Sequence, residues 1–466
     1  MASAVTVNIK MYRVGELGDC FLLRFTSGQE KSHVLIDCGS FSNSKASIER
    51  MKTIATDIKK QIGNNRLNVI AGTHQHNDHL SGFVHASGIF ESMSPEQVWL
   101  SWLDNPDDKK AREIGKDYNN YLTSLRMISS ELQRPGLGAT EIKRKLDGLL
   151  GFYGFSPEEL SKKAKTDSLP PAVPATAREI LQRIGKKKPS YLSPGEVLSL
   201  PGITGDSVKV YVLGPPKNED LLYDKEPGKG ESYDPKLAAN STTAYRMLNA
   251  LQKITNPGKS GTNETPFPFF EPYQESGNFK QVWDSYYSKK ESWRTIDLDW
   301  LNQAEQLALW LDGFTNNSSL VLAFELVKSN KVLLFAADAQ TGNWNSWREI
   351  KWKKKPKDFN WLSLLRNTVL YKTGHHGSHN STLVEGLENM THEELVVMIP
   401  VDKTDSHITK KNGWKMPAAN LYKELKKRSK NRVIRMDDGF SKVKAWNELK
   451  GKPSGNSLYW QIDING

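Results

Sequence analysis

Short apolar segments that end at a glycine or a polar turn recur in both halves of this 466-residue chain. In the first half they occupy residues 20–25, 33–39, 67–73 and 98–102. In the second half they occupy residues 208–214, 319–326, 331–338, 367–374 and 395–401. Compact apolar runs bounded by turn residues are typical of buried strands. Between residues 43 and 62 the apolar side chains follow helical spacing behind a candidate N-cap, Ser44, so an α/β layered fold is expected.

Two stretches interrupt this pattern. Residues 104–199 combine helical spacing with lysine clusters such as Lys162–Lys165 and Lys186–Lys188, and are predicted to form a basic helical insertion. Residues 217–316 are rich in glycine, proline, asparagine and aromatic residues, and are predicted to form a second insertion. The remaining segments are expected to form one domain. Its first half is residues 1–103, a core strand follows within residues 200–216, and its second half is residues 317–466.

Six of the ten histidines fall in two short groups, and each group directly follows an apolar strand. The groups are THQHNDH at residues 73–79 and GHHGSH at residues 374–379. A neutral imidazole offers a directed lone pair to zinc and similar cations. On an extended segment the i, i+2 spacing points His74 and His76 to the same side. The pattern therefore predicts a metal site, and two ions about 3.5–4 Å apart can clamp both oxygens of a displacement.

Five stretches carry a resemblance to a known superfamily: LGDC at 17–20, VLIDCG at 34–39, THQHNDHLSG at 73–82, LLFAAD at 333–338 and LYKTGHHGS at 370–378. In this order they resemble the metallo-β-lactamase superfamily. Within it the chain is most similar to the ComEC-type hydrolase domain of DNA-uptake proteins and to bacterial phosphorylcholine esterases. The matching parts, 5–102, 200–216 and 317–440, make up about half of the chain. The resemblance implies an α/β fold, a four-layer αββα sandwich with a metal site at the sheet edge, here with two large insertions.

The resemblance also implies ligands position by position. His74 and His76 would bind one ion, and Asp78 and His79 would bind the other. Asp338 would bridge both ions, because a carboxylate supplies two hard oxygens and offsets the charge between two cations.

A second histidine element is expected to complete the second ion. One of His375 and His376 would be the ligand, and His375 is preferred. Lys372 and His379 are expected to contact substrate or orient ligands, with a structural place at a strand end as the alternative. Asp37 is expected either to hydrogen-bond a metal-bound histidine or simply to end a strand.

Two positions depart from the superfamily pattern. The stretch that supplies the third protein ligand of the first ion, LHP in the superfamily, reads Leu213-Gly214-Pro215 here, and Gly214 has no side chain. A GHP stretch near the C-terminal helix likewise reads Lys415-Met416-Pro417. Either Asp104 or Asp220 from an insertion replaces the ligand, or the first site is weak. The predicted cofactor is therefore one or two ions of Zn²⁺ or Mn²⁺.

The charge balance bears on the substrate. Lys and Arg number 64 and Asp and Glu 53, which gives a net charge of +11. A positive balance favours nucleic acid or nucleotide partners, as does the lysine run at 351–357 with Trp352 inside it, although a solvated basic face is the alternative. The function expected is a metal-dependent phosphodiesterase or nuclease, in which a metal-held hydroxide attacks phosphorus and Asp78 or Asp338 takes the proton. The alternatives are an amide or lactone hydrolase of the same fold and a catalytically weak metal-binding module for nucleic acid or another partner.

Composition narrows the class of protein further. The two cysteines, Cys20 and Cys38, are too few for a disulfide scaffold or a multi-cysteine zinc module. No stretch approaches the ~18 apolar residues that a membrane helix needs, and the first residues do not resemble a secretory signal. A cytoplasmic protein without a membrane segment is expected, and the sequence leaves its oligomeric state open.

Overall fold

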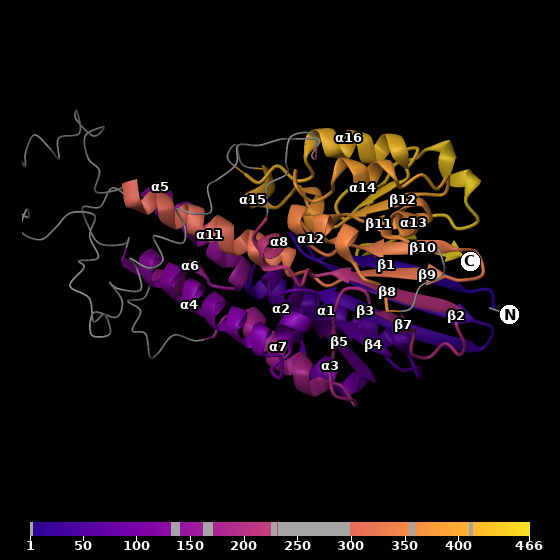
Figure 1. Cartoon of the computed structure of the whole chain (residues 1–466), viewed down its shortest axis with the longest axis horizontal. Coiled ribbons are helices and arrows are strands. Elements are labelled where there is room, and N and C mark those ends of the chain that lie inside the picture. Colours follow the sequence, from indigo (N-terminus) through magenta and orange to yellow (C-terminus); the bar gives the residue numbers. More distant parts are fainter. Residues whose placement is uncertain are drawn as a thin grey trace, which may run out of the picture.

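Two eight-stranded sheets face each other in the computed structural model, which describes residues 3–131, 140–161, 171–224, 231, 299–353, 359–409 and 413–466 (Figure 1). The first sheet contains, in spatial order, β15 (Ser454–Gly455), β16 (Tyr459–Asn465), β1 (Thr6–Tyr12), β2 (Cys20–Ser27), β3 (Glu30–Cys38), β4 (Val69–Ala71), β5 (Gln97–Ser101) and β6 (Ser190–Leu192). The second contains β14 (Gly439–Phe440), β13 (Val433–Arg435), β12 (Val396–Ile399), β11 (Thr368–Lys372), β10 (Lys331–Phe335), β9 (Val321–Leu326), β8 (Val208–Gly214) and β7 (Val197–Ser199). Each sheet has a parallel part, β3 to β6 in the first and β10 to β13 in the second.

Aromatic side chains fill the space between the two sheets. The ring of Phe21 on β2 lies 5.5 Å from the ring of Phe335 on β10. Phe25, four residues further along the same strand, lies 5.5 Å from Phe324 on β9. Because side chains alternate along a strand, residues an even number apart share a face, and this face of β2 is buried against the second sheet.

Helices cover the outer faces of both sheets, so the fold is an α/β sandwich (Figure 1). On the first sheet lie α1 (Lys45–Ile62), α2 (Asn77–His85), α3 (Ser87–Met93) and α7 (Val173–Ile184). On the second lie α12 (Thr341–Ser346), α13 (Trp361–Arg366), α14 (Val384–Glu388) and α16 (Ala419–Arg428). The prediction for α1 is confirmed: the Ser44 side chain accepts a hydrogen bond from Ser47 N, and Met51, Ile54 and Ile58 are buried on one face.

A second group of helices projects from one end of the sandwich (Figure 1). It consists of α4 (Lys109–Glu131), α5 (Thr140–Leu150), α6 (Pro157–Ser161) and α11 (Asp299–Asn317), with the short α8 (Glu219–Tyr223) beside α11. Aromatic stacking joins α8 to α11, since the Tyr223 and Trp310 rings lie 4.6 Å apart. Trp310 also lies 5.4 Å from the ring of Tyr121 on α4, so helices from both predicted insertions pack on one another.

The range predicted as the first insertion is not helical throughout. The range 104–199 also contains α7, which packs beside α2, and the strands β6 and β7. Tyr191 on β6 pairs with Leu100 of the first sheet, and Leu198 on β7 pairs with Val210 of the second. These strands are only three residues long, so their apolar pattern is too short to separate them from a loop.

Several predictions fall outside the described residues. These are most of the predicted second insertion (225–230 and 232–298) and the lysine clusters Lys162–Lys165 and Lys354–Lys357. In the part of the chain that the structure describes, no helix combines the length and the apolar character needed to cross a membrane.

Candidate metal centre

The first histidine group lies where β4 meets α2. His74 and His76 occupy the loop after the strand, and Asp78 and His79 lie in the first turn of α2. The carboxylate of Asp78 is stabilised in this first turn because the N-terminus of a helix carries partial positive charge. The chain after β3 passes directly against this turn: a Cβ at Gly39 would lie 2.6 Å from Asn77 O, so only glycine permits the approach.

The second sheet supplies the other side chains of the site. Asp338 follows β10, and its backbone N–H donates to Ser319 Oγ at 3.1 Å. His376 lies in the 3₁₀ turn η7 (Gly374–Gly377) after β11. Because β10 and β11 are parallel neighbours, both loops leave the sheet at the same edge, where they meet the first histidine group.

One buried group combines Asp78, His79, Asp338 and His376. His376 Nε2 lies 3.0 Å from Asp78 Oδ2 and 3.3 Å from Asp338 Oδ2. His79 Nε2 lies 3.2 Å from the same Asp338 oxygen. Two imidazoles and two carboxylates thus present one atom each to a common point, the donor set that zinc and manganese accept.

A second buried group combines His74, His76 and Asp338. His74 Nε2 lies 3.1 Å from His76 Nδ1 and 4.0 Å from Asp338 Oδ2. Asp338 therefore belongs to both groups, as the bridging position requires. The residues fit two cations sharing one carboxylate.

Unsatisfied atoms support that fit. Asp78 Oδ1, His79 Nε2 and Asp338 Oδ2 are buried and have no hydrogen-bond partner among the described residues. Leaving buried polar atoms without partners costs free energy, and a bound cation would satisfy them.

Hydrogen bonds from neighbouring groups orient three of the four candidate imidazoles. Asp37 Oδ2 accepts from His79 Nδ1 at 2.7 Å, so the expectation that Asp37 holds a candidate ligand is confirmed. Pro400 O accepts from His376 Nδ1 at 2.8 Å. Thr73 Oγ donates its proton to Asp37 at 2.7 Å and lies 3.1 Å from His74 Nδ1. In each ring the nitrogen opposite the hydrogen bond points into the site.

Burial and the neighbouring carboxylates shift the pKa values of the histidines in opposite directions. Burial alone would lower the pKa of His376, but Asp338 and the neighbouring carboxylates raise it to about 10. Burial is likewise outweighed at His79, whose pKa rises well above its usual value because of Asp338 and three other aspartates. At His76 burial prevails and lowers the pKa to about 4.

Asp19 and Lys372 form a buried ion pair under the site. Lys372 Nζ lies 2.5 Å from Asp19 Oδ2 and 3.4 Å from Asp338 Oδ1, and both side chains are almost fully buried. Lys372 thus contacts a candidate ligand. Asp19 was not singled out by sequence reasoning, although the LGDC turn that carries it was part of the resemblance. His379 is partly buried and belongs to none of the candidate metal groups among the described residues.

Of the two adjacent histidines, the structure places His376 and not the preferred His375 in a candidate metal group. His375 lies outside the candidate metal groups of the described residues, and its Nδ1 contacts Gln340 Nε2 at 2.8 Å and Ser378 Oγ at 2.9 Å. Both histidines have positive φ, 34° and 51°, so the tight turn sends consecutive side chains in different directions. No sequence pattern distinguishes which of the two faces the aspartates.

Asp104 and Asp220 are not found in the candidate metal groups either. Asp104 Oδ1 accepts from Gln75 Nε2 at 2.8 Å, and Asp220 is exposed in the first turn of α8. At Gly214, where the superfamily has a histidine, a side chain is excluded because its Cβ would collide with the amide of Asn343. Among the described residues, neither position 214 nor its two expected replacements therefore contributes to a candidate metal group.

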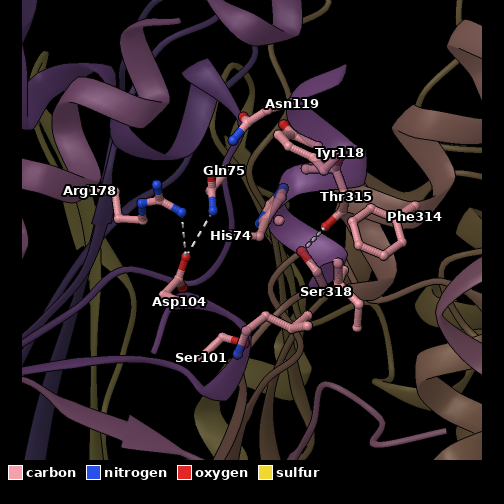
Figure 2. Close-up of a pocket in the computed structure, with 13 residues that line it drawn as sticks. His74, Gln75, Ser101, Asp104, Tyr118, Asn119, Arg178, Phe314, Thr315 and Ser318 are labelled. Atoms are coloured by element: carbon pink, nitrogen blue, oxygen red, sulfur yellow. Dashed lines mark hydrogen bonds and ion pairs between the residues drawn. The ribbon is translucent and has the colours of Figure 1, made fainter. Parts of the chain in front are cut away.

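A pocket of about 40 Å³ adjoins His74 (Figure 2). Tyr118 and Asn119 of α4, Arg178 of α7 and Thr315 of α11 line it, so helices from both insertions shape the approach to the site. Figure 2 shows Arg178 and Gln75 both directed at Asp104, and the Arg178 Nη1–Asp104 Oδ1 distance is 3.8 Å.

Comparison with known proteins gives no relative from which to assign this site: no family model and no curated protein matches the chain.

Proposed function

We propose that the protein is a metal-dependent hydrolase of the metallo-β-lactamase type. The observation that carries the proposal is Asp338, a buried carboxylate shared by two His/Asp groups at the ends of strands from two facing sheets. The helix-covered sandwich is compatible with the four-layer αββα fold that the sequence resembles. The proposed cofactor is two ions of Zn²⁺ or Mn²⁺.

The residues would divide the work as follows. Bound cations lower the pKa of water to about 7 and offset charge that develops on the substrate. Asp78 and Asp338 hold the cations, and either carboxylate can take the proton from the attacking water. Lys372 and Asp19 fix the position of Asp338 from below through their ion pair.

The substrate class proposed is a phosphodiester. The excess of 64 − 53 = 11 positive charges favours an anionic substrate over a neutral lactam or lactone. The pocket beside His74 is small, about 40 Å³, which makes small phosphodiesters the first substrates to test.

We expect the purified protein to bind at least one equivalent of Zn²⁺ or Mn²⁺ and to hydrolyse a bis(aryl)phosphate. The measurement is metal analysis of the untagged protein, followed by turnover of phosphodiester, lactone and lactam substrates with each metal. Well under one equivalent after supplementation would contradict the metal centre. Metal binding with turnover of lactones or lactams alone would favour the amide or lactone hydrolase, and metal binding without any turnover would favour the binding module.

The lysine clusters give a separate prediction for a polynucleotide substrate. A triple variant is expected to bind DNA or RNA more weakly and with a flatter salt dependence when its neutralised residues are Lys353, Lys354 and Lys355. The reason is that fewer counterions are released when the variant binds the polynucleotide. Hydrolysis of the small phosphodiester should stay nearly unchanged. Lys353 Nζ pairs with Glu196 at 3.1 Å, so Glu196→Gln is the matched control, which removes the partner and keeps the lysines. An unchanged salt slope in the triple variant would count against a polynucleotide substrate.

A further inference from the structure

Each candidate histidine ligand has two ring nitrogens, and the nitrogen outside the metal group shows how the ring is held. For His74, His79 and His376 that nitrogen contacts Thr73, Asp37 and the Pro400 carbonyl. His76 differs, because its Nδ1 faces His74 and its Nε2 points away from the group. His76 Nε2 is buried and has no hydrogen-bond partner among the described residues.

Asp312 faces that nitrogen. Its Oδ1 lies 3.6 Å from His76 Nε2, while its Oδ2 accepts a hydrogen bond from Asn316 Nδ2 at 3.1 Å. Asp312 and Asn316 are one turn apart on α11, so the helix itself holds the carboxylate in this orientation. Asp312 is 9% exposed, so its contact with His76 is shielded from solvent.

Several contacts fix α11 at this distance. Asn343, which fills the space at Gly214, donates from Nδ2 to Asn317 O at 2.9 Å and to Ser319 O at 3.0 Å. The hydroxyls of Tyr153 and Thr315 lie 3.2 Å apart. The same asparagine that excludes a histidine at position 214 therefore anchors the helix end that carries Asp312.

We propose that Asp312 is a positioning residue of the first metal site, which accepts the Nε2 proton of His76 and so directs the Nδ1 lone pair of His76 to the cation. The inference rests on the proposed metal centre and deepens it. A carboxylate in this place orients the ring and raises the basicity of the ligand nitrogen. It would strengthen a site that lacks the histidine usual at position 214.

Hydrogen bonds within the group indicate which nitrogen of His76 carries the proton. Thr73 Oγ has given its only proton to Asp37, so it accepts from His74 Nδ1, and His74 Nε2 is left as an acceptor. His76 Nδ1 must then donate to it, which leaves a lone pair on Nε2 opposite Asp312 Oδ1. If His74 and His76 held a cation, His76 would no longer need the proton on Nδ1 and would carry it on Nε2, where Asp312 would accept it.

The test is Zn²⁺ affinity, measured by chelator competition on the full chain. Asp312→Ala is expected to weaken the first of the two ions about 10- to 100-fold, the range found for carboxylates that hold a metal-bound histidine. Asp312→Asn, whose amide oxygen still accepts the proton, is expected to lose less. In a His76→Ala background, Asp312→Ala is expected to add almost nothing, because it acts through His76.

Asp405→Asn is the matched control. Asp405 is an equally buried aspartate that contacts a histidine outside the metal groups, His407 Nδ1, at 2.8 Å. Its substitution should leave Zn²⁺ affinity unchanged. Thermal unfolding of the metal-free variants shows whether each is folded.

Each result is decisive for one claim. If the wild type binds no Zn²⁺, the proposed function fails. If the wild type binds two ions and folded Asp312→Ala and Asp312→Asn proteins bind them equally well, only the role of Asp312 fails. The role of Asp312 would also be overturned if Asp312→Ala lowered Zn²⁺ affinity by the same factor in the His76→Ala background as in the wild type. It would equally be overturned if Asp104→Ala, and not Asp312→Ala, lost the ion.

Discussion

Asp338→Ala is expected to abolish hydrolysis, with a loss of about a thousandfold or more, and to release both ions. Asp338 belongs both to the group with Asp78, His79 and His376 and to the group with His74 and His76, so its removal takes a ligand from each. The charge stabilisation that metal ions supply in a transition state amounts to several kcal/mol, and about 1.4 kcal/mol corresponds to a factor of ten in rate. The measurements are turnover of the small phosphodiester and metal content per chain.

His79→Ala is expected to abolish hydrolysis as well, but to release only the ion of the second group. Both variants should stay folded, because Lys372 keeps its 2.5 Å pair with Asp19 when Asp338 is absent, and the two residues lie at strand and helix ends rather than in the core between the sheets. Asp405→Asn again serves as the control for loss of a buried carboxylate. Near-normal turnover with unchanged metal content in either variant would remove that residue from the mechanism.

The metal-free protein is expected to lose stability as the pH rises from about 6.5 to 8. The pKa of His376 is raised to about 10 in the folded state, from a usual value near 6.5. A base with a raised folded pKa stabilises the fold fully below its unfolded pKa, and this contribution is lost as the pH rises through the window up to about 10. Each such group contributes a slope of about 1.4 kcal/mol per pH unit. Burial lowers the pKa of Lys10 to about 8, so above that pH the titration of Lys10 also changes the stability. The prediction is therefore made for pH 6.5–8.

The measurement is the melting temperature with and without Zn²⁺ across this range. A cation replaces the protons that balance the carboxylates, so the melting temperature of the loaded protein should depend much less on pH, and its advantage over the metal-free protein should widen as the pH rises. His376→Gln removes one titrating group and should flatten the slope of the metal-free protein. A metal-free protein that becomes more stable between pH 6.5 and 8 would contradict the charge balance described for the site.

Local patterns were sufficient to predict most of the sandwich. The segment 208–214 was expected to be a strand and forms β8 over those residues, because a short, mostly apolar run with β-branched residues that ends at a glycine favours a buried strand. The helix behind Ser44 could be predicted for the same kind of reason, since an N-cap and apolar spacing are both properties of neighbouring residues. His74, His76, Asp78 and His79 lie within six residues, so their proximity is also fixed by the local chain.

Contacts between distant segments decided the rest. Asp78 and His376 are 298 residues apart, and only the packing of the two sheets shows that His376 rather than His375 reaches the aspartates. Asn343 excludes a side chain at Gly214, and Asp312 reaches His76 from an insertion that resembles no known motif. The sequence by itself therefore determined most of the strands, the first helix and the residue types of the candidate metal centre. Only the tertiary structure decided which side chains complete it, because that depends on how separate elements pack and not on the spacing within any one of them.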